Sequence, residues 1–226
     1  MESAVDQPRR YRGITASERR EARRERLMEA GLQLFGTTGY ASTSIRAISA
    51  EASLNSRYFY ESFGSREELL HAVYLRILSE LTVYAGAQVA AADTIEGRAR
   101  AGLRAGWSFL TEDPRRARIV AREVVGVSDE LEQLRRQMRH GLADVTVKGA
   151  TAFVGAGVEL RLDPVLTARS LMGGVVEMLS DWINGDVDAS VDEMVEHFTR
   201  LFTAAAYAAV VDPAPASPAR PERKTA

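Results

Sequence analysis

The chain has 226 residues, of which 46% are hydrophobic and 27% are charged, a composition typical of globular proteins. It contains no cysteine, which excludes disulfides, thiolate zinc sites and a thiol nucleophile. The net charge of −2 argues at first against a nucleic-acid partner. The charge is uneven, however, because the segment from Arg9 to Arg66 holds eleven arginines and six glutamates, an excess of five positive charges.

Two stretches of sequence bear on localisation. The first thirty residues are rich in Arg and Glu and lack the apolar core of a signal peptide. The longest apolar run, LFTAAAYAAVV at 201–211, is too short to span a bilayer about 30 Å thick. We therefore expect a cytoplasmic protein with no membrane partner.

The two ends of the chain differ in composition from the rest. Residues 1–14 include Arg9-Arg10-Tyr11-Arg12 and are predicted to form a flexible basic arm. Four of the seven prolines crowd the final stretch, DPAPASPARPERKTA. Such a segment cannot bury enough apolar surface to fold, so we expect 213–226 to be a disordered tail.

The first predicted helix begins at a capping box. Thr15 and Glu18 have the required spacing. The Thr15 hydroxyl can accept from the backbone N–H of Glu18, and the Glu18 carboxylate can accept from the backbone N–H of Thr15. An apolar stripe at helical spacing follows, formed by Leu27, Ala30, Gly31, Leu34 and Phe35. The glycines at 36 and 39 then end the helix. The mixed run EARRERLME within it is interpreted mainly as a solvated face of i,i+4 ion pairs.

Three further helix starts follow closely. Thr43 is the expected N-cap of a second, short helix, and Asn55 or Ser56 that of a third. Ser65 and Glu68 form a second capping-box pattern, which opens a long helix. This spacing predicts two short helices between two long ones.

The rear of the chain also reads as helical. Pro114 and Pro164 each follow an aspartate, and Asp-Pro is a helix-start signal because proline lacks an N–H that the first turn would leave unpaired. Further helices are expected at about 95–111, 114–127, 129–153, 165–184 and 190–211. No strand-like alternation occurs. The predicted fold class is all-α, with a three-helix unit over 15–66 and a larger helical bundle over 67–212.

Two short helices joined by a tight turn and packed on a longer helix form a helix-turn-helix, whose second short helix enters the major groove of DNA. Here that helix lies in LNSRYFYESF at 54–63. Phe59 and Phe63, four residues apart, are expected to join a small core of Phe35, Ile45, Ile48 and Leu54. Ser56, Arg57 and Tyr60 are left for solvent or DNA, with Tyr58 on the boundary.

The run from RRERLMEAGLQLFGTTGY through TSIRAISAEASLNSRYFYESFGSREELLHAVY resembles the DNA-binding domain of the TetR (tetracycline-repressor-like) family. The resemblance covers about residues 20–75. Two positions depart from the usual pattern. Ser53 stands where the family usually has glycine in the turn, which suggests a strained or altered backbone, and Ser62 stands where a histidine often lies, which puts a histidine–phosphate contact in doubt.

The resemblance implies roles for individual residues. Thr43, Ser44, Tyr60 and Arg66 would bind phosphate, whereas Arg46, Ser56, Arg57 and Tyr58 would face base edges. Asn55, a candidate cap, is included in the predicted DNA-binding set. The arm Arg9-Arg10-Tyr11-Arg12 would add contacts to the backbone or the minor groove.

The resemblance also implies a homodimer and a ligand. The dimer would form through about 165–211, where small residues (Gly173, Gly174 and the alanines at 204–206 and 208–209) lie among Met172, Phe198, Leu201, Phe202 and Tyr207. A small-molecule pocket in the bundle, favouring an apolar or aromatic compound, would be lined by Trp107, Phe109, Met138, Phe153, Met178 and Trp182. Taken singly, each of these residues is better interpreted as plain core, because aromatic and methionine side chains at helical spacing normally just pack.

Three functions remain open from the sequence. The first is a dimeric repressor that a ligand releases from a palindromic operator. The second is a DNA-binding regulator that has no small-molecule ligand and is constitutive or gated by a protein partner. The third, an all-α enzyme, is disfavoured because His71, His140 and His197 are far apart in sequence and match no metalloprotease spacing, and no P-loop is present. We predict no catalytic residues, no metal site and no cofactor.

Overall fold

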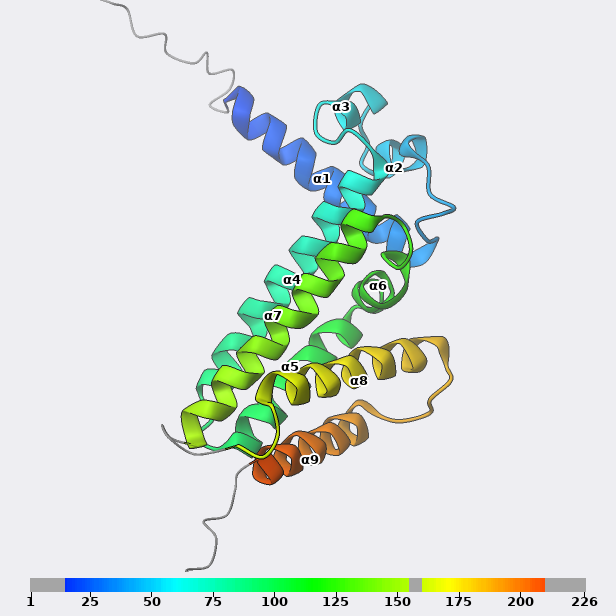
Figure 1. Cartoon of the computed structure of the whole chain (residues 1–226). Coiled ribbons are helices and arrows are strands. Elements are labelled where there is room, and N and C mark those ends of the chain that lie inside the picture. The colour runs from blue at the N-terminus through cyan, green and yellow to red at the C-terminus, as the bar shows by residue number, and fades with distance from the viewer. Residues whose placement is uncertain (1–14, 155–159, 210–226) are drawn as a thin grey trace, which may run out of the picture.

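The computed structural model describes residues 15–154 and 160–209 of the chain (Figure 1). Its helices are α1 (Ala16–Thr37), α2 (Ile45–Glu51), α3 (Ser56–Tyr60), α4 (Arg66–Ala90), α5 (Ile95–Glu112), α6 (Pro114–Arg118), the π-helix η1 (Ile119–Glu123), α7 (Asp129–Val154), α8 (Pro164–Asn184) and α9 (Val191–Ala209). These residues contain no β-strand, which confirms the all-α fold class. None of the helices is long and apolar enough to cross a membrane, within the same residues. The predicted arm (1–14) and the predicted tail (213–226) lie outside the described residues.

Most of the predicted helix starts are confirmed. The Thr15 hydroxyl accepts from the backbone N–H of Glu18, and the Glu18 carboxylate accepts from that of Thr15. Asp113 and Asp163 cap α6 and α8, each followed by a proline in the first turn. Asn55 caps α3 by accepting from the N–H of Arg57 at 2.9 Å. Local side-chain chemistry therefore sets where these helices begin.

The predicted cap of the second helix is wrong by one residue. Ser44 caps α2, and its hydroxyl accepts from the N–H of Ala47 at 3.1 Å. The Thr43 side chain points the other way, since its hydroxyl is buried and donates to the carbonyl of Gly39 at 2.7 Å. Thr43, which the local pattern favoured as a cap, thus stabilises the loop between α1 and α2 instead.

Two other expectations need correction. Ser65 caps α4 as predicted, but the Glu68 carboxylate accepts from the N–H of Gly64 at 2.6 Å rather than from Ser65, so the capping box is only half formed. The continuous helix predicted at 114–127 is wrong in form and extent. It consists of the short helix α6 followed by η1, which ends at Glu123.

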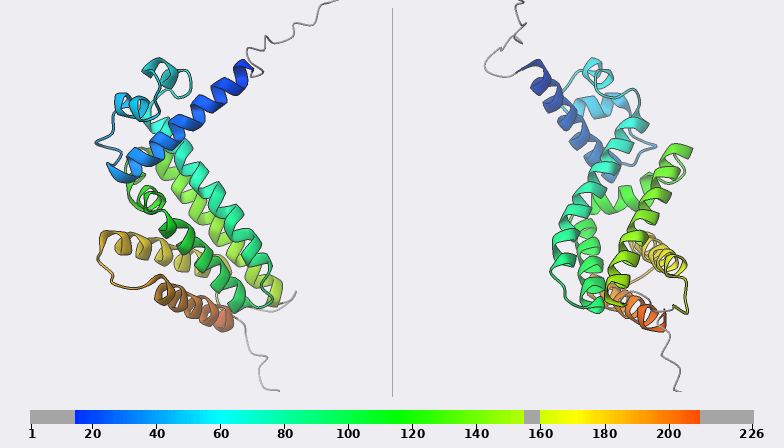
Figure 2. Two further views of the ribbon diagram at one scale, coloured as in Figure 1. Left: turned by 180° about the vertical axis from the view of Figure 1, so that it is seen from behind. Right: turned by 60° about the vertical axis from the view of Figure 1, so that its left-hand side comes forward.

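The helices of the predicted three-helix unit lie at one end of the molecule. Figure 1 shows α1, α2 and α3 together there, while α4 leads away from them along the length of the rear bundle. The last helices, α8 and α9, lie side by side toward the opposite end, and the two views in Figure 2 agree on this arrangement. The DNA-reading candidates and the dimerisation candidates therefore occupy different parts of the molecule.

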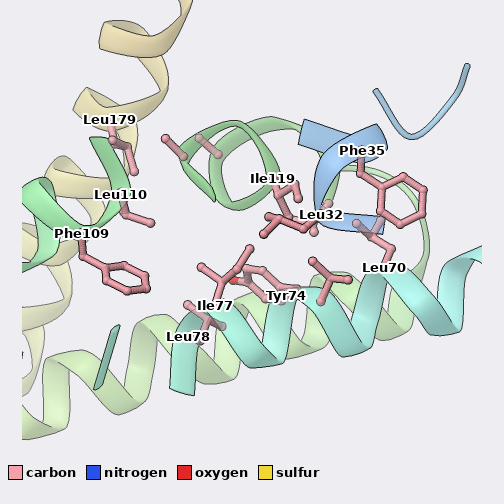
Figure 3. Close-up of a cluster of buried hydrophobic side chains, with 14 of the residues drawn as sticks. Leu32, Phe35, Leu70, Tyr74, Ile77, Leu78, Phe109, Leu110, Ile119 and Leu179 are labelled. Carbon is pink, nitrogen blue, oxygen red and sulfur yellow. The ribbon is translucent and has the colours of Figure 1, made fainter. Parts of the chain in front are cut away.

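A single buried core links the two predicted units. Figure 3 shows side chains from α1, α4, α5, η1 and α8 in one cluster, including Leu32, Phe35, Leu70, Tyr74, Leu110, Ile119 and Leu179. Phe35, Leu70 and Ile119 are fully buried, so helices on both sides of the predicted boundary at 66/67 share one interior.

Candidate nucleic-acid interface

The short helix α3 and the turn after it are attached to the core by Phe59 and Phe63. Phe59 and Phe63 are 0% and 1% exposed, with ring centroids 6.0 Å apart. Ile48 of α2 is buried, and Leu54 packs against the same cluster. The predicted division of the aromatic segment is confirmed for these inner residues, since they are core and cannot meet a ligand.

The turn between α2 and α3 contains an unusual backbone conformation. Ser53 has a φ of +51°, which is the only positive φ of a non-glycine residue among those the structure describes. This conformation is costly for a residue with a Cβ atom, and explains why glycine is the usual choice there. Arg26 of α1 donates from one guanidinium nitrogen to the carbonyls of Ala52 and Ser53. The arginine thus holds in place a turn that serine disfavours.

Two more arginines of α1 contact α3 or its flank. The guanidinium of Arg23 lies over the ring of Tyr58, 4.6 Å from its centroid. Arg24 lies 4.3 Å over the ring of Phe63 and donates to the carbonyl of Ser62 at 3.0 Å. The interpretation of this run as mainly a solvated face is therefore wrong for these arginines. Their targets are aromatic faces and backbone carbonyls distant in sequence, which helical periodicity alone does not indicate.

Arg66, predicted to bind phosphate, also contacts the protein itself. Its guanidinium donates to the carbonyls of Tyr40 and Thr43 and lies 4.9 Å over the Tyr40 ring. These contacts hold the loop between α1 and α2. Thr43 is likewise committed to that loop through its buried hydroxyl.

The remaining predicted residues lie on the outside. The side chain of Arg57 is 84% exposed, and Tyr60 is 62% exposed. Arg46 is exposed on α2, while Tyr58 is near the boundary at 37% and Ser56 is half-buried. Ser44 and Asn55 are exposed and serve as the caps of α2 and α3. A hollow of about 380 Å³ lies on this surface, lined by Asn55, Arg57, Tyr58 and Glu61.

The surface can therefore hold an anionic, grooved polymer. Exposed guanidinium groups bind phosphates and guanine edges. Arg57 and Tyr60 project from a helix whose inner side is fixed in the core. A rigid helix that carries exposed cationic and aromatic side chains is the arrangement used to read DNA.

The loop between α1 and α2 is joined to the rear bundle by polar contacts from η1. The Glu123 carboxylate accepts from the N–H of Tyr40 at 2.7 Å and from Nε of Arg118 at 2.8 Å. Arg118 also donates to the carbonyl of Thr37 at 2.6 Å. Gly39 has a φ of +96°, which a side chain would strain. The position of α2 therefore depends on residues of the rear half.

The end of α1 and the start of α6 are in very close contact. A Cβ atom at Gly36 would lie 2.7 Å from the Cα of Arg115, so the two backbones approach as near as they can. Arg115 donates to Gln33 at 2.7 Å and to both carboxylate oxygens of Asp113. The hydrogen bonds from the Arg115 side chain lower the pKa of the Asp113 carboxyl below its ordinary value, against the opposing effect of burial.

The predicted ligand-binding residues are packed in the rear bundle. Trp107 and Phe109 are 3% and 6% exposed, and Met138, Met178 and Trp182 are half-buried. The rings of Trp107 and Trp182 meet edge to face at 6.1 Å, which brings two of the candidates together. The side chain of Phe153 lies outside the described residues.

The rear half also carries an open groove of about 490 Å³, between η1 and the end of α8. It is lined by Ala121, Arg122, Val125, Ser180, Ile183 and Asn184, none of which was predicted. Within residues 15–154 and 160–209, no group of three or more histidine, aspartate and glutamate side chains is placed to hold a metal ion.

The front of the chain matches a known family of proteins. Residues 27–73 match the family model described as bacterial regulatory proteins, tetR family. No curated protein matches the sequence.

Solved structures match over a longer stretch. The fatty acid degradation regulator FadR from Bacillus halodurans is 17% identical, with a TM-score of 0.69 over 80% of this chain and 94% of its own. FadR from Bacillus subtilis, in complex with stearoyl-CoA, is 16% identical, with a TM-score of 0.72 over 80% and 98%. A putative TetR-family regulator from Syntrophomonas wolfei is 20% identical, with a TM-score of 0.69 over 83% and 96%. At these identities the likeness describes the fold.

A helix-turn-helix head carried on an all-helical bundle is the architecture of a DNA-binding regulator of transcription. The match at 27–73 covers the end of α1, both short helices and the start of α4. Residues 27–73 therefore form a DNA-binding domain of the kind described for the tetR family of bacterial regulatory proteins.

Proposed function

We propose that the protein is a dimeric repressor that leaves a palindromic operator when a small apolar ligand binds its rear bundle. The observation that carries the DNA-binding part is the exposed set Arg46, Arg57 and Tyr60 on helices anchored by buried residues. Arg57 would read guanine through its two terminal nitrogens, and Tyr60 would bind a phosphate. The protein would act in the cytoplasm, where its operator lies.

The surface of α8 and α9 supports the dimer. Leu201 and Tyr207 are 42% and 69% exposed on α9, and Leu166 is 66% exposed on α8. A Cβ atom at Gly173 would have no neighbour within 4 Å, which leaves room for a partner helix. By contrast Met172, Phe198 and Phe202, also expected to supply contact area, are buried in their own protomer. A two-fold dimer would place two heads on half-sites about one helical turn apart, or a multiple of that.

An apolar ligand is supported by the interior and by one neighbour. The B. subtilis FadR structure contains stearoyl-CoA, whose acyl chain is long and apolar. In this chain Trp107 is buried with an indole N–H that has no hydrogen-bond partner among the described residues, an arrangement suited to a ligand carbonyl or hydroxyl next to apolar walls. Ligand would have to favour one arrangement of the bundle over another, and the contacts from α6 and η1 would carry that change to α1 and α2.

A second candidate function is a DNA-binding regulator without a small-molecule ligand, constitutive or gated by a protein partner. It is favoured by the tight packing of the predicted ligand residues and by the position of the larger groove, which none of them lines. The two candidates share the DNA-binding head and differ in what controls it.

The DNA-binding part is tested by selecting duplexes from a random pool with the intact protein and measuring binding by gel shift. A repressor should enrich a palindrome and bind it with strong salt dependence. Arg57→Ala should lose about 1–3 kcal/mol of base discrimination, whereas Arg136→Ala on the exposed face of α7 should bind normally. Failure of the wild-type protein to enrich any sequence would contradict the proposal.

The ligand part is tested separately with stearoyl-CoA and free stearate. Either compound should raise the unfolding temperature and release the selected duplex. Stabilisation by neither compound, nor by shorter acyl or aromatic acids, would favour the regulator without a ligand.

A further inference from the structure

Glu61 lies between two arginines at the C-terminal end of α3. One carboxylate oxygen accepts from Nε of Arg57 at 3.3 Å, and the other lies 3.6 Å from a terminal nitrogen of Arg23. Arg57 is four residues away on the same helix, while Arg23 belongs to α1. The glutamate therefore connects the exposed arginine of α3 to the long helix behind it.

The contact to Arg57 leaves the reading end of the side chain available. Glu61 takes the Nε–H, whereas a bidentate contact to guanine O6 and N7 can use the two terminal nitrogens of arginine. The Arg57 side chain is 84% exposed and would otherwise sample many rotamers. A partner at Nε restricts those rotamers without blocking the face that meets a base.

Glu61 itself is held in place from behind. The Arg23 side chain is only 24% exposed and its guanidinium lies over the Tyr58 ring at 4.6 Å. Glu61 is 35% exposed, so its carboxylate is fixed between the two guanidinium groups while part of it faces outward. A negative charge at this surface repels phosphates equally at every sequence, which lowers non-specific affinity.

We propose that Glu61 is a specificity-determining residue, which holds Arg57 oriented for one base. The proposal rests on the DNA-binding function proposed above and adds a residue to it. Arg23 and Tyr58 are positioning residues in the same row, Tyr58–Arg23–Glu61–Arg57. On the correct sequence Arg57 gains its guanine contact at little entropic cost, whereas at other sequences the same orientation gains no contact.

The test measures the ratio of affinities for the selected duplex and for a scrambled duplex, with the intact protein. Glu61→Ala should lower this ratio about fivefold, the range expected for one exposed ion pair. Glu61→Gln keeps an acceptor for Nε and should fall between the wild type and Glu61→Ala. Glu51→Ala removes an exposed carboxylate at the end of α2 and should leave the ratio near the wild-type value. Circular dichroism checks that each variant is folded.

A double-mutant cycle separates an effect through Arg57 from a simple charge effect. In an Arg57→Ala background, Glu61→Ala should leave the ratio unchanged, because the arginine it orients is gone. An equal fall in both backgrounds, or an unchanged ratio in Glu61→Ala alone, would overturn the inference. If the wild-type protein selects no sequence at all, the proposed DNA-binding function fails instead, so the two failures are distinguishable.

Discussion

The front and rear of the molecule expose different kinds of side chain. At the front, the phenylalanines are buried and the exposed groups around α3 are arginine, tyrosine and other polar side chains, with three arginines of α1 fixed on rings and carbonyls. At the rear, α8 and α9 leave leucines and a tyrosine exposed, with empty space beside a glycine. Polar surfaces of the first kind suit a charged polymer, and apolar surfaces of the second suit another protein surface. The two halves therefore expose surfaces that suit different kinds of partner.

The largest expected effect tests the rear surface. Leu201→Glu would place a charge on the proposed dimer face of α9, and the dimer dissociation constant should rise at least about 100-fold, near 3 kcal/mol. Sedimentation velocity at micromolar concentration should then show monomers. Val83→Glu on α4, where the valine is 76% exposed, should leave the dimer intact. If wild type and Leu201→Glu sedimented equally, the exposed face of α9 would not be the dimer surface, and the contrast between the two halves would fail.

The junction between the halves is tested by Gly36. In Gly36→Ala the new methyl group would meet the Arg115 backbone, and the free energy of unfolding should fall by about 1–3 kcal/mol. Gly86→Ala, near the C-terminal end of α4, meets nothing within 4 Å among the described residues and should instead stabilise by about 0.5–1 kcal/mol. Urea unfolding measures both. Stabilisation by both substitutions would show that α1 and α6 separate easily.

A smaller effect tests the arginine that holds the front turn. Arg26→Ala removes hydrogen bonds to the carbonyls of Ala52 and Ser53 and should cost about 1–2 kcal/mol of stability, with weaker DNA binding. Ser53→Gly relieves the positive φ and should recover about 1 kcal/mol in that background. Chemical denaturation of the two single variants and the double variant checks this. Absence of recovery would mean that the arginine acts elsewhere than at the turn.

The smallest expected effect concerns acid stability at the α1–α6 contact. The pKa of Asp113 is lowered mainly by hydrogen bonds from the Arg115 side chain, so its contribution is present above the pKa of the unfolded chain. It is lost as the pH falls below about 4 toward the folded pKa. Asp113→Asn keeps the cap acceptor and should flatten this acid loss by about 1 kcal/mol. Unfolding measured from pH 6 to pH 3 tests this, with Asp144→Asn, an exposed residue of α7, as control. Parallel acid profiles for wild type and Asp113→Asn would contradict it.

The front unit was more predictable than the rear for a physical reason. Caps such as Thr15 and Asn55 act within four residues, and the spacing of Phe59 and Phe63 depends only on helix geometry, so a sequence contains these signals. The partners of Arg26 and Arg66 lie more than twenty residues away, and only packing brings them together.

The rear bundle was harder to interpret for the same reason. Phe198 and Leu201 both suggested contact area, yet one is buried and the other is exposed. Their orientation depends on which neighbours α9 meets. The switch from α6 to η1 likewise has no local signal of the kind that caps provide. Predicted ligand residues such as Trp107 are buried whether they form a pocket or plain core.

The continuous interior in Figure 3 has a consequence for how the protein melts. Phe35, Leu70 and Ile119 come from both units and pack in one interior. The head and the bundle should therefore unfold in a single cooperative transition. A compound that binds only the bundle would then raise the melting temperature of the head by mass action. An isolated fragment of residues 15–66 would lack the α4 and η1 side chains that close its interior and should not fold by itself.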